Sequence, residues 1–325
     1  MTVSAGRGLQ SLSGKDPRSY VPHALHGDGR SYPETNCFTD LTIELLHACG
    51  YEPLAACGHL VRMDFEGDQW TFFKPPLEDL ETLFGIDIHE MMPYRPLPDQ
   101  IAEQIDRGRT IIVELDAFYL PDTASTSYRT EHVKTAIAPD AIDHAAEVLH
   151  YFHNAGLYEL SGEDYRAVLR LSADLPDEAL RPYTELVRFD AGPRLEGEDL
   201  RRASLALLRH HLERRPSANP FDLFGAQLSL DLESLLAEGL ETYHAYAFAT
   251  VRMVGAAFEL AASYAEWLFG EEAAAATGAM QEIVDGCKAL SFRLARRRQF
   301  DPSGTIEGLA GAWSAAMAAL EANAG

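Results

Sequence analysis

The sequence predicts an α+β fold in its first half and an all-helical second half. Over residues 19–165, apolar residues recur at helical spacing and then in short β-branched runs bounded by turn residues. After residue 165 they recur almost entirely at helical spacing, in segments rich in the strong helix former alanine. We therefore expect an α+β domain over residues 19–165 and a helical domain over residues 166–325.

The first 18 residues are polar and rich in Gly and Ser, and we expect them to form a flexible N-terminal segment. They show neither the apolar core of a secretory leader nor the basic amphipathic pattern of a transit peptide. No run approaches the roughly 20 apolar residues that a membrane span needs. The most apolar helix, over residues 246–269, carries Arg252, Glu259 and Glu266 and is predicted to be a core helix. We therefore expect a soluble, cytoplasmic protein.

The first predicted element is a helix over residues 38–49 that begins at or beside Cys37. Apolar side chains recur there at helical spacing, and Gly50 follows in the position where helices usually stop. A hairpin and two short helices are expected next, over residues 60–73, 77–84 and 97–107.

An antiparallel sheet is predicted from three apolar runs, over residues 110–115, 131–138 and 148–154. A polar loop over residues 116–129 follows the first run, and residues 139–147 connect the other two. The last run continues toward Leu160. The second half is expected to form helices over residues 162–171, 177–186, 197–214, 228–269, 273–297 and 305–323.

The net charge of −23, from 50 acidic and 27 basic residues, argues against nucleic-acid binding. Arginines nevertheless gather in two places in the second half, between Arg201 and Arg215 and then at Arg293, Arg296, Arg297 and Arg298. These clusters are either solvated helix faces or a docking surface for an acidic partner.

Four cysteines occur, at Cys37, Cys49, Cys57 and Cys287, without a CxxC pair, so we expect reduced thiols and no disulfide framework. No metal site is expected either. His150 and His153 would point to opposite faces of their strand because their separation is odd.

Cys37 is the candidate nucleophile because it lies at the predicted start of a helix. A helix N-terminus presents unpaired N–H groups and a partial positive charge, which lower a thiol pKa and stabilise an oxyanion. A cysteine nucleophile also needs a base and a group that orients the base. The sequence offers His132 at the start of one predicted strand and Asn154 at the end of the next. The order Cys37, His132, Asn154 is that of papain-like enzymes.

The chain resembles the bacterial domain-of-unknown-function family 1839 in four segments, TNCF (35–38), DAFYLPD (116–122), YRTEHVK (128–134) and YFHNAG (151–156). More distantly, it is similar to butirosin-type acyltransferases, which are papain-like and move an acyl group from a carrier protein to an amine. This resemblance implies a papain-like fold, with the first helix packed on an antiparallel sheet. It also implies acyl or aminoacyl transfer, no bound cofactor, and a carrier-protein phosphopantetheine thioester as donor.

The sequence departs from papain-like enzymes ahead of the cysteine, where a Gln usually donates to the oxyanion. Asn36, Arg30 and His26 are the candidates to replace it. The polar loop and its neighbours offer candidate substrate contacts at Asp116, Tyr119, Tyr128 and His153. The group that orients the base stays open, because Asp140, Asp143 and His153 lie close to Asn154 in the sequence.

Three functions are compatible with these residues. The first is a cysteine-dependent acyltransferase that accepts an acyl group on Cys37 and passes it to a small amine or hydroxyl. The second is an amidase or peptidase, in which water replaces the acceptor. The third is a carrier-protein-binding protein without catalytic activity.

Overall fold

The computed structural model describes residues 9–171, 182–296 and 298–325. Contacts between residues divide the chain into two units whose segments alternate along the sequence. The sheet unit comprises Met1–Ala24, Asn36–Glu52 and Leu80–Arg194, and the helical unit comprises Leu25–Thr35, Pro53–Asp79 and Leu195–Gly325.

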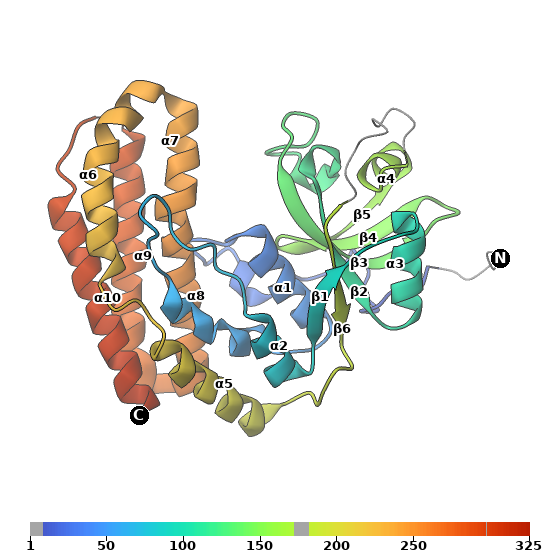
Figure 1. The fold of residues 1–325 in the computed structure, drawn as a ribbon, viewed down its shortest axis with the longest axis horizontal. Helices are drawn as coiled ribbons and strands as arrows, with labels where there is room; N and C mark the ends of the chain where they lie inside the picture. The colour runs from blue at the N-terminus through green and yellow to red at the C-terminus, as the bar shows by residue number, and fades with distance from the viewer. Residues whose placement is uncertain (1–8, 172–181, 297) are drawn as a thin grey trace. The chain divides into compact units, whose positions relative to one another are not determined.

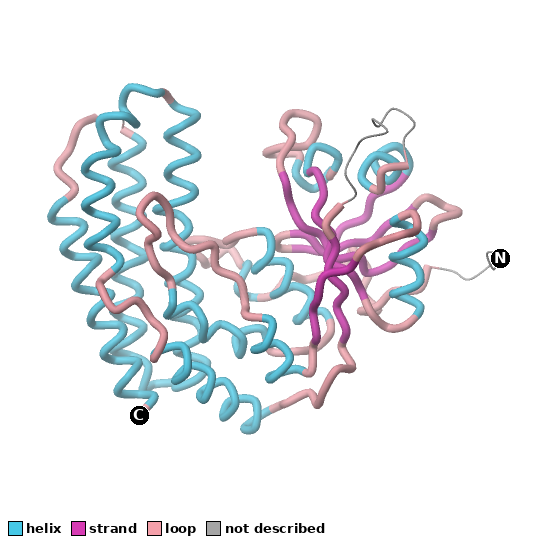
Figure 2. Tube along the Cα trace, in the orientation of Figure 1, coloured by secondary structure: helices cyan, strands magenta, loops and turns pink. Residues whose placement is uncertain are grey.

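The sheet unit is built on a six-stranded antiparallel sheet, shown in magenta in Figure 2, with the strand order β1-β6-β2-β3-β4-β5. Its strands are β1 (Asp87–Met91), β2 (Thr110–Asp116), β3 (Lys134–Asp143), β4 (Val148–His153), β5 (Gly156–Ser161) and β6 (Thr184–Arg188). In the register of β2 and β3, Asp116 at the end of β2 lies opposite Lys134 at the start of β3. The end of β2 and the start of β3 therefore share one edge of the sheet.

Helices pack on the strands of this unit. Helix α1 (Cys37–Ala48) contacts β3, β4 and β5, and α3 (Leu97–Asp106) contacts β2 and β3. The sheet unit also contains α4 (Gly162–Val168) and the 3₁₀ turns η3 (Ala117–Tyr119) and η4 (Pro121–Thr123). Helix α2 (Leu77–Phe84) begins in the helical unit and ends in the sheet unit. Apolar side chains of α3, β2, β3, β4 and α4 form one buried core, in which Tyr151 and Tyr165 are fully buried.

The helical unit contains the C-terminal helices and two short N-terminal pieces, η1 (Ala24–His26) and η2 (Pro53–Arg62). Its helices are α5 (Gly197–Leu212), α6 (Pro220–Glu238), α7 (Leu240–Ala247), α8 (Met253–Phe269), α9 (Ala274–Ala295) and α10 (Ser303–Ala324). The π-helical turn η5 (Phe248–Arg252) and the 3₁₀ turn η6 (Gly270–Ala273) interrupt the path from α7 to α9. Figure 1 shows α8, α9 and α10 side by side, in agreement with their mutual contacts.

The structure confirms the α+β class, the antiparallel sheet and the helical C-terminal region. It differs at the expected boundary near Tyr165, because the sheet takes a further strand, β6, from residues beyond it. The helix expected over residues 177–186 overlaps β6, and residues 172–181 lie outside the described part of the chain. The hairpin expected after residue 60 is also different, since η2 continues through Arg62 and only Phe65 and Trp70 form a β-bridge.

The N-terminal segment that we expect to be flexible is attached to the sheet from Ser11 onward. Ser11 forms a β-bridge with Ala141, and its hydroxyl donates to Asp140 Oδ2 at 2.6 Å. The Ser13 backbone N–H donates to Asp140 Oδ1 at 2.8 Å. Asp140 is fully buried, and these bonds supply partners for both of its carboxylate oxygens.

One helical stretch, Leu240–Ala295, is long and apolar enough to cross a membrane by length and composition alone. Of its most apolar window, 61% is buried inside the protein. This is the burial of a core helix, as the charged residues along it predict.

The turn between α2 and β1 allows a test of how backbone packing stabilises the sheet unit. Gly85 has φ +64°, and a Cβ there would lie 2.2 Å from the carbonyl oxygen of Gly192. We expect Gly85→Ala to lower the free energy of unfolding by more than about 2 kcal/mol, because it adds a backbone clash to the cost of positive φ. Gly108→Ala is the matched control, with φ +72° and open space at its Cβ. Urea unfolding of both variants measures the difference, and equal losses would contradict the expectation.

Candidate active site

Helix α1 begins at Cys37 because Asn36 caps it. Asn36 is in extended conformation, and its side-chain oxygen accepts a hydrogen bond from the Thr39 backbone N–H at 3.0 Å. Asn is among the most favourable residues at this position. The cap fixes Cys37 as the first residue of the helix, where the helix dipole is positive. It also engages the Asn36 side chain, which was a candidate oxyanion donor.

The half-buried Cys37 sulfur lies beside the first residues of β3. Burial raises the pKa of the Cys37 thiol, and Asp40 acts in the same direction. Three groups oppose this, namely the Lys134 ammonium and hydrogen bonds from the Ala136 backbone and the Thr135 side chain. The net direction is opposite to the lowered pKa that the helix N-terminus alone leads us to expect.

Burial also dominates the surroundings of the other cysteines. Burial raises the pKa of both Cys49 and Cys287 to about 12, and Cys57 is buried. All four cysteines are free thiols, as the sequence predicts. Cys37 differs because Lys134, Ala136 and Thr135 of β3 act to lower its thiol pKa, against the larger effect of burial.

A buried chain of hydrogen bonds continues from Thr135. The Thr135 hydroxyl lies 2.7 Å from His153 Nε2, and His153 Nδ1 lies 2.5 Å from Asp122 Oδ2. The Tyr151 hydroxyl donates to the other Asp122 oxygen at 2.5 Å. Burial, and then Asp122, raise the pKa of Tyr151, so this hydroxyl stays protonated. The side chains of His153 and Asp122 are 1% and 4% exposed.

A second His–Asp pair lies at the exposed end of β3. His132 Nδ1 is 2.6 Å from Asp116 Oδ2, and the His132 ring stacks on Phe118 with 4.3 Å between ring centroids. The His132 side chain is 67% exposed. Asp116 also caps η3, because its other oxygen accepts from the Phe118 backbone N–H at 3.1 Å. Both members of this pair are candidates from the sequence.

The structure places Asn154 in the turn between β4 and β5, where its φ is +44°. Asn tolerates this left-handed conformation better than most residues do. The His132 nitrogen that was expected to face Asn154 is instead bonded to Asp116. His132 precedes Lys134 by two residues, so the chain places its Cα within about 7 Å of a residue that acts on Cys37.

Two candidate substrate contacts, Tyr119 and Tyr128, surround Arg129. The Arg129 guanidinium lies 5.5 Å from the Tyr119 ring centroid and 5.4 Å from that of Tyr128. Asp164 holds this group together, since it accepts from Tyr128 at 2.9 Å and from Arg129 at 2.5 Å. These contacts order the loop that follows β2.

Arg30 and His26, the other two candidate oxyanion donors, belong to the helical unit. Arg30 donates to Ser263 Oγ at 2.6 Å and lies 3.8 Å from Glu259, both on α8. Burial lowers the pKa of Arg30. His26 is the last residue of η1. The structure therefore gives Arg30 a structural role in joining the segment after η1 to α8.

The two arginine clusters differ in their partners. Between Arg201 and Arg215, each arginine contacts a backbone carbonyl, a carboxylate or a histidine of the helical unit. Arg293, Arg296 and Arg298 are exposed and have no ion pair within the described part of the chain. Arg297 lies outside the described residues. The cluster near Arg293 is therefore the more accessible positive surface.

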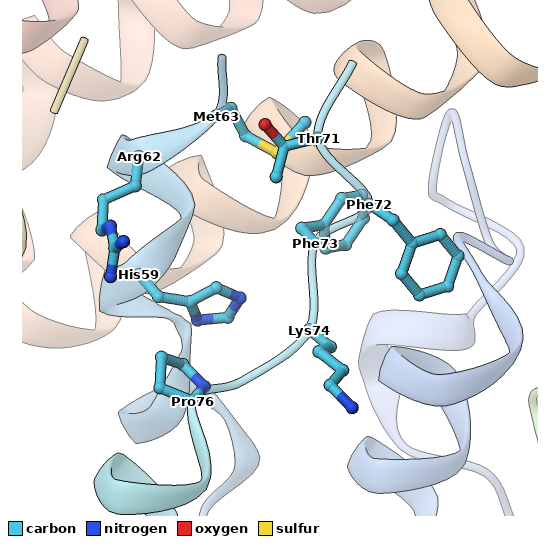
Figure 3. Close-up of a pocket in the computed structure, with 8 residues that line it drawn as sticks. All are labelled: His59, Arg62, Met63, Thr71, Phe72, Phe73, Lys74 and Pro76. Atoms are coloured by element: carbon cyan, nitrogen blue, oxygen red, sulfur yellow. The ribbon is translucent and has the colours of Figure 1, made fainter. Parts of the chain in front are cut away.

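A small pocket of about 180 Å³ lies in the helical unit. Figure 3 shows the His59 ring pointing from η2 toward the segment that carries Phe73, Lys74 and Pro76. His59 Nδ1 donates to the Ala56 carbonyl at 2.9 Å, and its buried Nε2 has no partner among the described residues. The walls are mainly apolar, which suits a small apolar ligand better than an ion.

No group of three or more His, Cys, Asp or Glu side chains in the described part of the chain is arranged to hold a metal ion.

The family comparison agrees with the fold. Residues 21–189 match the DUF1839 N-terminal domain, and residues 197–322 match the DUF1839 C-terminal domain. Together these matches cover most of the chain, so the chain belongs to the DUF1839 family. The junction between the two domains lies beside Leu195, where the last segment of the helical unit begins. No curated protein matches the chain.

Sequence reasoning missed Asp122, Thr135 and Lys134. Asp122 was visible as the last residue of the family segment 116–122, but nothing local paired it with His153, 31 residues away. Thr135 and Lys134 follow His132 closely, and the strand they begin was predicted. Their proximity to Cys37 arises only when α1 packs on β3.

His59 makes the helical unit sensitive to acid. Burial lowers the pKa of His59 to about 4, against about 6.5 in the unfolded chain. Between pH 6.5 and pH 4, His59 therefore binds a proton in the unfolded state but not in the folded state. The free energy of unfolding keeps its full value above pH 6.5 and falls by about 3 kcal/mol as the pH falls toward 4. We expect His59→Gln to flatten the decline in unfolding free energy between pH 7 and 4.5, measured in urea.

The exposed His244 in the same unit provides the control for this measurement. His244→Gln is expected to follow the wild-type decline. An unchanged decline in His59→Gln would mean that His59 is protonated in the folded protein.

Proposed function

We propose that this protein is a cysteine-dependent acyl or aminoacyl transferase with a papain-like sheet unit. It accepts the group from a carrier-protein phosphopantetheine thioester and passes it to a small amine or hydroxyl in the cytoplasm. One observation supports this most directly. Cys37 is the first residue of α1, and Lys134, Thr135 and Ala136 of β3 act to lower the pKa of its thiol against the larger effect of burial. These are conditions that stabilise a thiolate.

In the first half-reaction, the Cys37 thiolate attacks the thioester carbonyl, the carbon–sulfur bond to the carrier breaks, and the carrier's phosphopantetheine leaves as a thiolate. One thioester replaces another, so the enzyme needs a thiolate, an oxyanion site and exclusion of water. The first turn of α1 and the Lys134 ammonium supply positive potential near the sulfur. Glu114 accepts from Lys134 at 2.7 Å and raises its pKa, which keeps the ammonium charged.

In the second half-reaction, an amine or hydroxyl attacks the Cys37 acyl-enzyme and loses a proton. His132 is the proposed base, as the sequence predicts. Its exposed ring is accessible to a diffusing acceptor, and Asp116 fixes the tautomer that leaves Nε2 unprotonated. Asp116 thus takes the orienting role that papain-like enzymes give to Asn or Asp. Water in place of the acceptor would make the protein a hydrolase with the same residues.

Mass spectrometry of the intact protein tests this function. We expect incubation with an acyl-loaded carrier protein to add the acyl mass to Cys37, and an amine or hydroxyl acceptor to remove it. Cys37→Ala abolishes the adduct and turnover, because it removes the nucleophile. His132→Ala slows discharge of the adduct by about 100-fold or more, as loss of a general base does. Cys57→Ala, which alters a buried thiol, serves as the control.

The outcomes separate the three candidate functions. Free acid without an acceptor indicates a hydrolase, and carrier binding without an adduct indicates a binding protein. Transfer that persists in Cys37→Ala would contradict the proposal itself.

The carrier is expected to dock on the exposed arginines near the end of α9. Carrier proteins of this proposed kind are acidic, and a chain of net charge −23 repels them unless it presents a local positive surface. We expect the triple change of Arg293, Arg296 and Arg298 to Glu to weaken carrier binding by at least about tenfold at low salt. Reactivity toward a small soluble thioester should be unchanged.

Arg18→Glu is the control for this experiment, because it reverses an exposed arginine in the sheet unit. Calorimetric titration of the carrier at two ionic strengths measures the effect. Equal affinity of the wild type and the triple variant would assign the cluster to a solvated helix face.

A further inference from the structure

We propose that the pocket of the helical unit binds a small phenol, whose hydroxyl donates a hydrogen bond to His59 Nε2. Every residue that lines this pocket belongs to the Pro53–Asp79 segment of the helical unit. Cys37 belongs to the sheet unit, so the inference does not rest on the proposed transferase function.

The hydrogen bond that His59 makes leaves its Nε2 as an acceptor. A carbonyl oxygen only accepts, so the Nδ1 that lies 2.9 Å from the Ala56 carbonyl oxygen carries the proton. Burial lowers the pKa of His59 to about 4, so the imidazole is neutral at pH 7 and Nε2 keeps its lone pair. This buried nitrogen has no hydrogen-bond partner among the described residues. A ligand that satisfies it must bring a donor.

The charges around His59 favour a neutral donor over an ammonium group. Arg62 of η2 lines the pocket and acts to lower the pKa of His59, as a nearby positive charge does. The same charge repels a cationic ligand. Asp79 acts on His59 in the opposite direction, but it already accepts a hydrogen bond from His211 Nε2 at 2.8 Å. The donor that suits these surroundings is a hydroxyl group.

The apolar walls of the pocket suit an aromatic ring. Met63 and Phe73 are 2% and 3% exposed and line the pocket together with Pro76. Figure 3 shows Met63, Phe73 and the His59 ring around the same space. A thioether and an aromatic ring both pack favourably against a second aromatic ring. An apolar cavity of roughly 150 Å³ holds a benzene molecule, and this pocket has about 180 Å³.

A water molecule satisfies the pocket less well than a phenol does. A buried water makes about three hydrogen bonds to polar groups. The Thr71 hydroxyl also lines the pocket, but it already donates to the Asp64 carbonyl at 3.1 Å. A water bonded to His59 Nε2 would leave the apolar walls uncovered. A phenol makes the same hydrogen bond and buries its ring against them.

Three ligands of nearly equal size separate the hydrogen bond from the apolar contact. Phenol donates a hydrogen bond, methoxybenzene only accepts one, and toluene does neither. Calorimetric titration of the full chain at pH 7 measures the affinity for each ligand. We expect phenol to bind at least about fivefold more tightly than the other two, which is the effect of about one neutral hydrogen bond. Equal affinities, or no binding of phenol at millimolar concentrations, would overturn the proposal.

His59→Phe keeps an aromatic ring and removes the acceptor. We expect this variant to bind phenol at least about fivefold more weakly, while its affinity for toluene stays within about twofold of the wild type. The matched control is His244→Phe, which changes an exposed histidine of α7 and should retain the wild-type affinities. Unchanged phenol binding in His59→Phe contradicts the proposal. The ligand series on the wild type decides the question where His59→Phe does not fold.

Nitrogen NMR of the histidine-labelled chain shows where phenol binds. Phenol should move the resonance of the unprotonated His59 Nε2 toward that of a protonated nitrogen, and toluene should move it less. The resonance is identified by its absence in His59→Phe. Phenol-induced shifts confined to other histidines would refute the site. Cys37→Ala should bind phenol as the wild type does, so failure of the transferase function and failure of this site are distinguishable.

Discussion

The candidate site depends on one packing contact, that of the first turn of α1 against the first residues of β3. This contact places the Cys37 sulfur beside Lys134, Thr135 and Ala136. The Asn36 cap and the helix dipole act on Cys37 from its own helix, but the ammonium and the hydrogen bonds come from the strand. Pairing of β3 with β2 sets Asp116 opposite Lys134. Lys134, which acts on Cys37, therefore lies at the same sheet edge as Asp116, the partner of His132.

The sequence could predict the parts of this arrangement that local patterns encode. Helical periodicity and Gly50 located α1, and an Asn immediately before Cys37 is a cap by residue type alone. The strand starting near His132 was equally visible. The contacts between side chains of different elements could not be predicted. Asp122 and His153, for example, belong to different segments, and nothing in either segment specifies the other. The sequence indicates Asp116 as a candidate but pairs His132 with Asn154 instead. The error arises because the position of Asn154 in a turn depends on the tertiary structure.

Strand pairing explains the errors in the fold in the same way. β6 is short and follows residues that resemble a helical run, and it becomes a strand by pairing with β1 and β2 on its two sides. One residue of the N-terminal segment uses a polar side chain in the fold. The Ser11 hydroxyl and the Ser13 backbone N–H are the partners of Asp140, a carboxylate that would otherwise be buried without these two hydrogen bonds. From composition alone, such a segment is predicted to be a flexible tail.

The His132–Asp116 and His153–Asp122 pairs of the sheet unit differ in their exposure to solvent. The His132 ring is two-thirds exposed and stacked on Phe118, so a base there can exchange protons with a group that arrives from solution. The His153 ring is enclosed, and its two nitrogens are engaged by the Thr135 hydroxyl and by Asp122. Exposure therefore separates the two imidazoles, because a group that arrives from solution can reach the His132 ring, whereas the His153 ring belongs to the buried hydrogen-bond network of the sheet unit.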